Sequence, residues 1–227
     1  MLESFEKVPV KVYTTPTEGS NVLAAQIAKL IREKQAQNLP CVLGMATGAT
    51  PILLYKELVR MHKEEGLSFK NVITINLDEY YPIPRSAYQS YWSFMHRHLF
   101  DHIDIDPKNI NLPNSEWNKD ELKESCVAYE QTIEKIGGID LQILGIGKNG
   151  HIGFNEPGSS FHSKTRVIHL DQQTRMANLY EWHDLNKVPR TAITVGISSI
   201  MKAKKIVLLA WGNKAEIVAK AIEGDVT

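Results

Sequence analysis

The stretch GIGKNGHIGFNEP, residues 145–157, contains residue types that can move protons. His151 can exchange a proton near neutral pH, and a carboxylate such as Glu156 can orient or tune a neighbouring histidine. Asn149 lies two residues before the histidine. Because glycine permits sharp backbone turns, the pattern predicts a turn that presents His151 and Glu156 for acid–base chemistry. A structural turn with a hydrogen-bonded histidine is the alternative interpretation.

The same stretch matches the pattern G-x-G-x-x-G through Gly145, Gly147 and Gly150. In a dinucleotide-binding loop the third glycine opens a helix, whose free N–H groups meet the pyrophosphate. Here the following residues, IGFNEPGSSFHSKT, have no helical periodicity. Asp171 stands about 20 residues on, where a ribose-binding acid would be. Without the intervening helix, however, the stretch does not predict a dinucleotide site.

Two acidic residues, Asp78 and Glu79, directly follow the apolar run VITINL. We expect one carboxylate to face the binding site and the other to have a local structural role. A carboxylate at the end of a buried strand is a candidate general base. A turn carboxylate that caps local N–H groups is the alternative.

The segment ATGATP, residues 46–51, places Thr47, Gly48, Ala49 and Thr50 before a predicted helix. Backbone N–H groups at a helix N-terminus, with hydroxyl groups beside them, form a cradle for phosphate. The segment lacks the lysine of a nucleoside-triphosphate loop, so it does not predict that ligand. An ordinary capped helix is the competing interpretation.

Strands and helices alternate along the chain. Apolar runs predict strands at 8–14, 41–45, 72–77, 140–146 and 205–210, and periodic segments predict helices at 15–38, from Thr50 onward, 88–100, 120–135 and 213–223. The pattern indicates a single α/β domain over residues 1–227, a doubly wound, mostly parallel sheet with helices on both faces. It is Rossmann-like without being dinucleotide-binding. Since ligands bind at the carboxyl ends of such strands, we expect the three segments above to meet there.

Composition limits the function classes. The chain has 227 residues with 26 Lys and Arg against 26 Asp and Glu, so no basic field favours nucleic acid. No apolar stretch approaches a membrane span, and two cysteines are too few for a disulfide framework. These features predict a soluble, cytoplasmic protein with reduced thiols. The histidines of HRHLFDH, residues 96–102, do not predict a metal site, because no third ligand accompanies them.

The whole pattern resembles the glucosamine-6-phosphate deaminase family of sugar-phosphate isomerases. The resemblance runs from the first predicted strand to the last helix and is most specific in five stretches: ATGATP, SFKNVITINLDEY, SYWSFMHRHLF, GIGKNGHIGFNEPGSSFHSKTR and VPRTAITVGISSIMKAKKI. It implies conversion of glucosamine 6-phosphate and water to fructose 6-phosphate and ammonia, without cofactor or metal. The related 6-phosphogluconolactonases share the first loop, but the continuation FNEP favours a deaminase.

The resemblance also implies residue roles. Asp78 matches the family's base, His151 the residue that helps open the sugar ring, and Glu156 its supporting carboxylate. Residues 47–50 match the phosphate loop, Lys214 lies near the phosphate-binding lysine, and residues 170–190 correspond to a mobile lid. The resemblance further predicts that the family fold continues beyond Thr227, in a longer protein.

Two departures from the family keep alternatives open. Asn149 stands where many members carry aspartate, and Tyr180 stands where well-known members place a phosphate-binding arginine, for which Arg175 is a candidate substitute. The alternatives are a non-catalytic sugar-phosphate binding or sensing domain and a lactonase-like enzyme on the same scaffold. The expected partner is a small-molecule sugar phosphate, with no nucleic acid and no membrane; homo-oligomer formation is left open.

Overall fold

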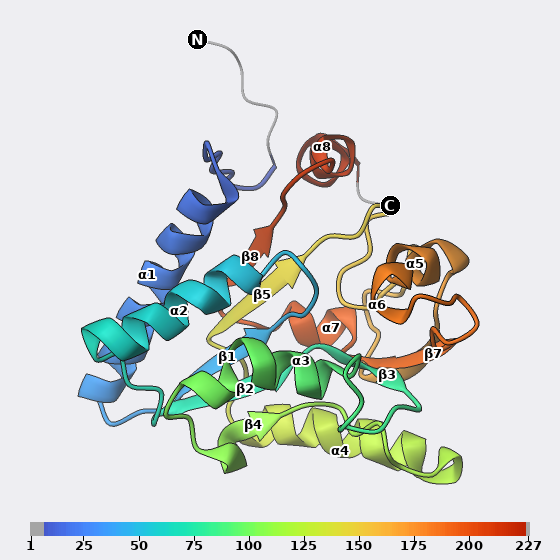
Figure 1. Ribbon diagram of the computed structural model, residues 1–227, viewed down its shortest axis with the longest axis horizontal. Coiled ribbons are helices and arrows are strands. Elements are labelled where there is room, and N and C mark those ends of the chain that lie inside the picture. Colours follow the sequence, from blue (N-terminus) through green and yellow to red (C-terminus); the bar gives the residue numbers. More distant parts are fainter. Residues whose placement is uncertain (1–6, 226–227) are drawn as a thin grey trace.

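The computed structural model describes residues 7–225 and is built on a five-stranded parallel sheet (Figure 1). The strand order is β4-β2-β1-β5-β8, and every pair of neighbours is parallel. The strands are β1 (Cys41–Met45), β2 (Val72–Asn76), β4 (Ile110–Asn111), β5 (Leu141–Gly145) and β8 (Ile206–Leu209). The predicted α/β fold with a mostly parallel sheet is therefore confirmed.

Helices cover this sheet. All five residues of β1 are buried, which requires that both faces of the central strand be covered. The longer helices are α1 (Pro16–Ala36), α2 (Ile52–Glu65), α3 (Tyr91–His98), α4 (Leu122–Lys135) and α8 (Ala215–Glu223). Figure 1 shows α1 and α2 side by side at the left of the view, with α4 along its lower edge. Short helices are α5 (Gln172–Ala177), α6 (Leu179–Trp182) and α7 (Ile197–Ile200).

A second, antiparallel sheet was not predicted. It has the order β3-β7-β6 and consists of β3 (Asp78–Tyr81), β7 (Thr191–Thr194) and β6 (Arg166–His169). Leu77 alone separates β3 from β2, so the chain passes directly from the parallel sheet into the antiparallel one. Asp78 is the first residue of β3, and this places the candidate base at the junction of the two sheets.

The strand predicted at 8–14 is wrong. Residues 9–13 have no regular structure, and Val8 and Val12 are 50% and 91% exposed. These two valines are not covered by a neighbouring layer, and among the described residues β8 pairs only with β5. A strand pattern without a partner does not form a ladder.

Helix α1 begins where the sequence predicts, and helix α2 does not. The capping box of α1 is confirmed, because the Thr15 hydroxyl accepts from the Glu18 amide at 3.1 Å and the Glu18 carboxylate accepts from the Thr14 amide at 3.0 Å. Helix α2 begins one residue later than expected, and Thr50 does not cap it. Pro51 occupies the N-cap position without a side-chain cap, while the Thr50 carbonyl accepts from the Trp211 indole.

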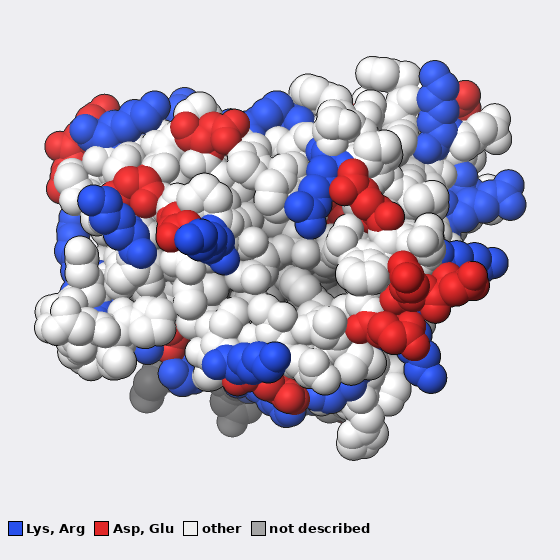
Figure 2. Space-filling view, turned by 90° about the horizontal axis from the view of Figure 1, so that it is seen from below, with Lys and Arg blue, Asp and Glu red and all other residues white. Residues whose placement is uncertain are grey.

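Charges on the surface are mixed. Figure 2 shows Lys, Arg, Asp and Glu side chains interspersed over one face, around an uncharged hollow near its centre. That face therefore presents no extended basic area. No helix among residues 7–225 is long and apolar enough to cross a membrane. Both cysteines, Cys41 and Cys126, are free and buried.

Candidate active site

The three segments predicted to carry the chemistry meet at one edge of the parallel sheet. They follow the carboxyl ends of β1, β2 and β5, which are adjacent parallel strands. Two contacts bring a fourth segment to them: the Trp211 indole donates to the Thr50 carbonyl at 3.2 Å, and the Lys214 ammonium donates to the Ile146 carbonyl. The arrangement is the one expected for ligand binding in an open α/β sheet.

Asp78 is buried, with 5% of the residue exposed. Its carboxyl group has no hydrogen bond to another group in the described part of the chain. It lies opposite Thr194 in the β3–β7 ladder. The loop after β5 passes close over it, because a Cβ built on Gly153 would lie 3.2 Å from Asp78 Oδ2. Burial, with the charge of Glu79 adding to it, raises the pKa of Asp78 to about 8. A buried carboxyl with unused acceptors is suited to take a proton from a ligand.

Glu79 has the structural role that was expected for one of the two carboxylates. Three backbone amides donate to it at 2.9 Å each, those of Tyr80, Tyr91 and Trp92. Two of these amides belong to the first turn of α3, so Glu79 holds the N-terminus of that helix. Burial raises the pKa of Glu79 to about 7, and the three amide donors oppose that rise.

An aromatic cluster packs beside Asp78. Tyr80, on the same face of β3, lies 5.0 Å from the Tyr91 ring, 5.3 Å from the Phe154 ring and 5.5 Å from the Trp182 ring, measured between centroids. Trp182 comes from α6 and meets Tyr80 edge-on. The cluster therefore joins the segment predicted as a lid to the strand that carries the candidate base.

His151 is held by an amide that bridges it to a carboxylate. Its Nδ1 lies 2.7 Å from Asn149 Oδ1, and Asn149 Nδ2 donates to Glu156 Oε2 at 2.8 Å. The amide oxygen accepts only, so we infer that Nδ1 carries the proton and that Nε2 is the free acceptor. Burial lowers the pKa of His151, the charge of Glu156 opposes this shift, and Lys214 adds to it. The ring is thus favoured in its neutral, proton-accepting form.

Glycines in this loop leave room for the His151 ring and allow the turn beside it. A Cβ on Gly147 would overlap three atoms of the His151 imidazole ring, so only glycine leaves room for the ring at this point. Gly150 has φ +91°, a conformation that L side chains rarely adopt. Residues 147–158 form turns and a short bridge rather than a helix, and Asp171 caps α5 by accepting from the Gln173 amide. The sequence prediction that no helix follows Gly150 within these residues is confirmed.

Thr174 is a residue of the site that the sequence did not indicate. It lies in α5 and is 2% exposed, and its hydroxyl donates to Glu156 Oε1 at 2.6 Å. The Asp171 amide reaches the same oxygen at 3.4 Å. A threonine in a polar segment gives no local signal of such a contact, because only the fold brings α5 onto the loop after β5.

The residues predicted to bind phosphate lie in three segments. The 47–50 segment forms the turn before α2, where Gly48 has φ +85° and open space at its Cβ position. Lys214 borders the loop of His151, and burial lowers its pKa. Arg175 Nη2 donates to the carbonyls of Leu185 and Val188 at 2.6 and 3.1 Å, so its guanidinium faces the backbone of its own segment. Phosphate contact by these residues stays a prediction.

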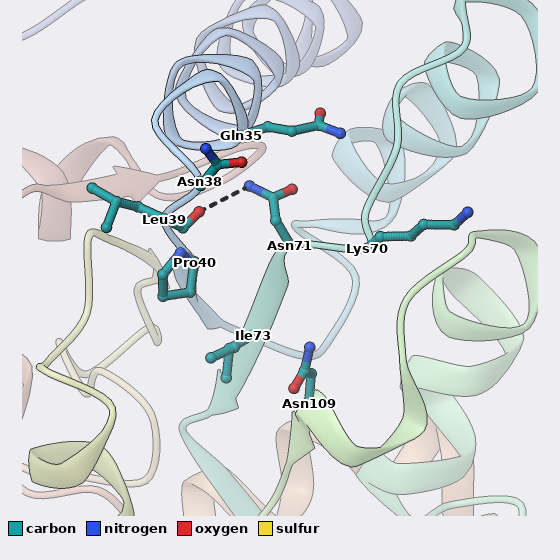
Figure 3. A pocket seen from close by; sticks show the side chains of 8 residues that line it. All are labelled: Gln35, Asn38, Leu39, Pro40, Lys70, Asn71, Ile73 and Asn109. Carbon is teal, nitrogen blue, oxygen red and sulfur yellow. Dashed lines mark hydrogen bonds between the residues drawn. The ribbon is translucent and has the colours of Figure 1, made fainter.

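One surface cavity borders these contacts and another lies away from them. One of about 470 Å³ is bordered by Glu156, Ser159 and Arg166, and Arg166 donates to Asn155 Oδ1 at 2.8 Å. The other, about 340 Å³, lies at the amino ends of β1 and β2, opposite the candidate site (Figure 3). Asn71 lines it and donates to the Leu39 carbonyl. No group of three or more His, Cys, Asp or Glu residues within 7–225 is arranged to hold a metal ion.

The fold and site define an α/β protein whose acid–base side chains gather at the carboxyl edge of a parallel sheet. Residues 14–227 match the family described as glucosamine-6-phosphate isomerases/6-phosphogluconolactonase, and the chain belongs to this family. A glucosamine-6-phosphate deaminase of Thermoanaerobacter sp. strain X514 is 49% identical over 218 residues, covering 95% of this chain and 84% of the relative.

A putative glucosamine-6-phosphate deaminase-like protein of Bacteroides thetaiotaomicron is 46% identical over 228 residues, and this chain spans 34% of its length. Among solved structures, a monomeric glucosamine-6-phosphate deaminase has a TM-score of 0.92 at 43% identity, covering 97% of this chain and 89% of that one. A 6-phosphogluconolactonase from Trypanosoma brucei, at 19% identity and a TM-score of 0.73 over 95% of this chain and 86% of its own, shares the fold.

Proposed function

We propose that this chain is a glucosamine-6-phosphate deaminase, which converts glucosamine 6-phosphate and water to fructose 6-phosphate and ammonia without a cofactor or metal. One observation carries the proposal: a buried carboxyl with unused acceptors, Asp78, lies under the same loop that holds the chain of hydrogen bonds from His151 through Asn149 to Glu156. Relatives of that name, 44–49% identical over most of the chain, support it.

Ring opening is assigned to His151. Its neutral Nε2 takes the proton of the anomeric hydroxyl and returns a proton to the ring oxygen as the C1–O5 bond breaks. Glu156 favours the transient imidazolium by its charge, which Asn149 transmits through its amide dipole. Asn149 is therefore a positioning residue for the histidine.

Isomerisation is assigned to Asp78. The ionised carboxylate removes the proton from C2 of the open chain, which leaves an enolamine, and delivers the proton to C1. Water then adds at C2 and ammonia leaves, so that C2 becomes the carbonyl of fructose 6-phosphate. The loop of Thr47, Gly48, Ala49 and Thr50, with Lys214, anchors the phosphate and turns remote binding energy into alignment of C1 and C2. Arg175, the candidate substitute for a phosphate-binding arginine, donates to the Leu185 and Val188 carbonyls and so holds the segment that carries α5.

Incubation with glucosamine 6-phosphate, with ammonia and fructose 6-phosphate both measured, tests the proposal. We expect equal amounts of the two products. A folded protein that is stabilised thermally by glucosamine 6-phosphate but releases neither product would instead be a sugar-phosphate binding domain. Turnover of 6-phosphogluconolactone in place of the amino sugar would identify a lactonase. We place the reaction in the cytoplasm, where the phosphorylated sugar is retained.

A further inference from the structure

The segment predicted as a lid makes a direct contact with the candidate ring-opening group. Helix α5 buries Thr174, whose hydroxyl donates to Glu156 Oε1 at 2.6 Å and lies 3.5 Å from His151 Nδ1. The next residue, Arg175, ties the helix to the carbonyls of Leu185 and Val188. The position of Thr174 is therefore fixed by the fold of the whole segment.

The Thr174 hydrogen bond determines how Glu156 faces the loop after β5. One carboxylate oxygen accepts from Thr174, and the other accepts from Asn149 Nδ2 at 2.8 Å. With its NH₂ group directed at Glu156, the Asn149 amide must direct its oxygen at His151 Nδ1. The hydroxyl is thus the first member of a chain of hydrogen bonds that ends at the imidazole ring.

Nothing else among the described contacts fixes Glu156 as well. Without the hydroxyl, Oε1 would keep only the Asp171 amide at 3.4 Å, beyond the range of a good hydrogen bond. The carboxylate could then rotate. The Asn149 amide would be held only by the His151 backbone N–H, which donates to its oxygen at 3.2 Å, and it could turn over and present a donor to the ring. A turned amide would favour the other tautomer, in which Nδ1 accepts and Nε2 carries the proton.

We infer that Thr174 is a positioning residue for ring opening: through Glu156 and Asn149 it holds His151 in the tautomer whose Nε2 accepts the sugar proton. The inference rests on the proposed function for its kinetic consequence, and on the hydrogen bonds alone for its structural one. It gives α5 a chemical role, since the histidine is correctly oriented only when that helix lies on the loop.

The test compares Thr174→Val with Thr174→Ser, which removes the hydroxyl in one variant and keeps it in the other. Because loss of an orienting partner outside the reacting atoms reduces activity by about 10–100-fold, we expect kcat of T174V to fall by that factor with KM changed by less than about threefold. T174S should retain kcat within about threefold. Thr132→Val, in α4, where the Thr132 hydroxyl bonds the Ala128 carbonyl, is the matched control and should leave kcat unchanged.

A second readout needs no substrate. The ¹⁵N chemical shifts of the His151 ring, assigned with His151→Gln, report which nitrogen carries the proton. We expect a protonated Nδ1 in the wild type, T174S and T132V, and a mixed or Nε2-protonated ring in T174V. An unchanged tautomer in folded T174V would overturn the inference even if the protein did not act on glucosamine 6-phosphate. Should T174V fail to fold, Thr174→Ala provides the same comparison.

Discussion

The two regions that we propose to handle protons are built in opposite ways. Asp78 is surrounded by packed residues, including the aromatic cluster on β3, and no donor from the described residues bonds its carboxyl group. Around His151, by contrast, each side chain has a partner: the ring meets Asn149, Asn149 meets Glu156, and Glu156 meets Thr174. The pKa shifts of the two groups also differ. Burial raises the pKa of the Asp78 carboxyl. Burial lowers the pKa of His151, and the charge of Glu156 opposes that shift.

This difference has a chemical meaning. A base that must reach two carbons of a ligand keeps its acceptors free, and it is costly for the protein to ionise it before the ligand arrives. A histidine that must both accept and return a proton needs a fixed tautomer, which hydrogen bonds provide. Glu79, next to Asp78, shows that the chain can saturate a buried carboxylate when the role is structural.

Replacing the free base should have the largest effect. Asp78→Asn removes the proton acceptor and keeps the shape, so we expect kcat to fall by about 10³-fold or more, within the range that acid–base catalysis contributes. Thermal stabilisation by glucosamine 6-phosphate should persist, because the phosphate contacts are unchanged. Ammonia release at an undiminished rate would remove Asp78 from the mechanism.

Breaking the saturated region should cost less. Asn149→Leu leaves His151 Nδ1 and Glu156 Oε2 without partners, and we expect kcat to fall by about 10²-fold. Asn149→Asp is the control: its carboxylate can still accept from Nδ1, and the added charge should raise the pKa of His151. If N149L and N149D had equal activity, the bridging role of the amide would be wrong.

The pH dependence should distinguish the two regions. Only the ionised Asp78 accepts a proton, and its pKa lies at about 8. Below that pH, kcat/KM should fall by about tenfold per pH unit, and above it the profile should level off. The titration of the substrate amine is measured separately and divided out. In N149L the fall of kcat/KM at acid pH should have the same midpoint, with a lower plateau. A shifted midpoint in N149L would show that Asn149 affects the titration of Asp78.

A separate effect is expected on stability. The pKa of Asp78 rises from 3.8 to about 8 on folding, so its contribution is fully present below about pH 4 and is lost as pH rises toward 8. Asp78→Asn removes this loss. We expect the Tm of D78N to exceed that of the wild type at pH 8 and to lie closer to it at pH 4.5. Equal Tm values at both pH values would contradict a buried, destabilised carboxyl.

Much of the parallel sheet could be predicted from the sequence, because its strands are short apolar runs between amphipathic helices. The antiparallel sheet could not. Its strand DEYY at 78–81 has neither alternation nor an apolar run, and it forms because the chain continues from β2 into pairing with β7. Conversely, residues 8–14 have a strand pattern but no neighbouring strand, so local pattern without a partner was misleading.

The site was predictable where chemistry is concentrated in a short stretch. His151, Asn149 and Glu156 lie within eight residues, and Asp78 follows a buried strand. Two features depended on tertiary structure: the Thr174 hydroxyl, which only the docking of α5 brings to Glu156, and the orientation of Arg175 toward Leu185 and Val188. Long-range contacts of single polar side chains leave no periodic signal in a sequence.

The proposed contrast between an Asp78 carboxyl without hydrogen-bond partners and a histidine held at Nδ1 by hydrogen bonds is tested most directly by titrating the Asp78 carboxyl. Its ¹³Cγ resonance, assigned by its absence from Asp78→Asn, can be followed by NMR in the protein without substrate. We predict a midpoint at about pH 8, with the carboxyl protonated at neutral pH. A midpoint near 3.8, the ordinary value for aspartate, would show that the carboxyl is solvated or hydrogen-bonded and would contradict the account.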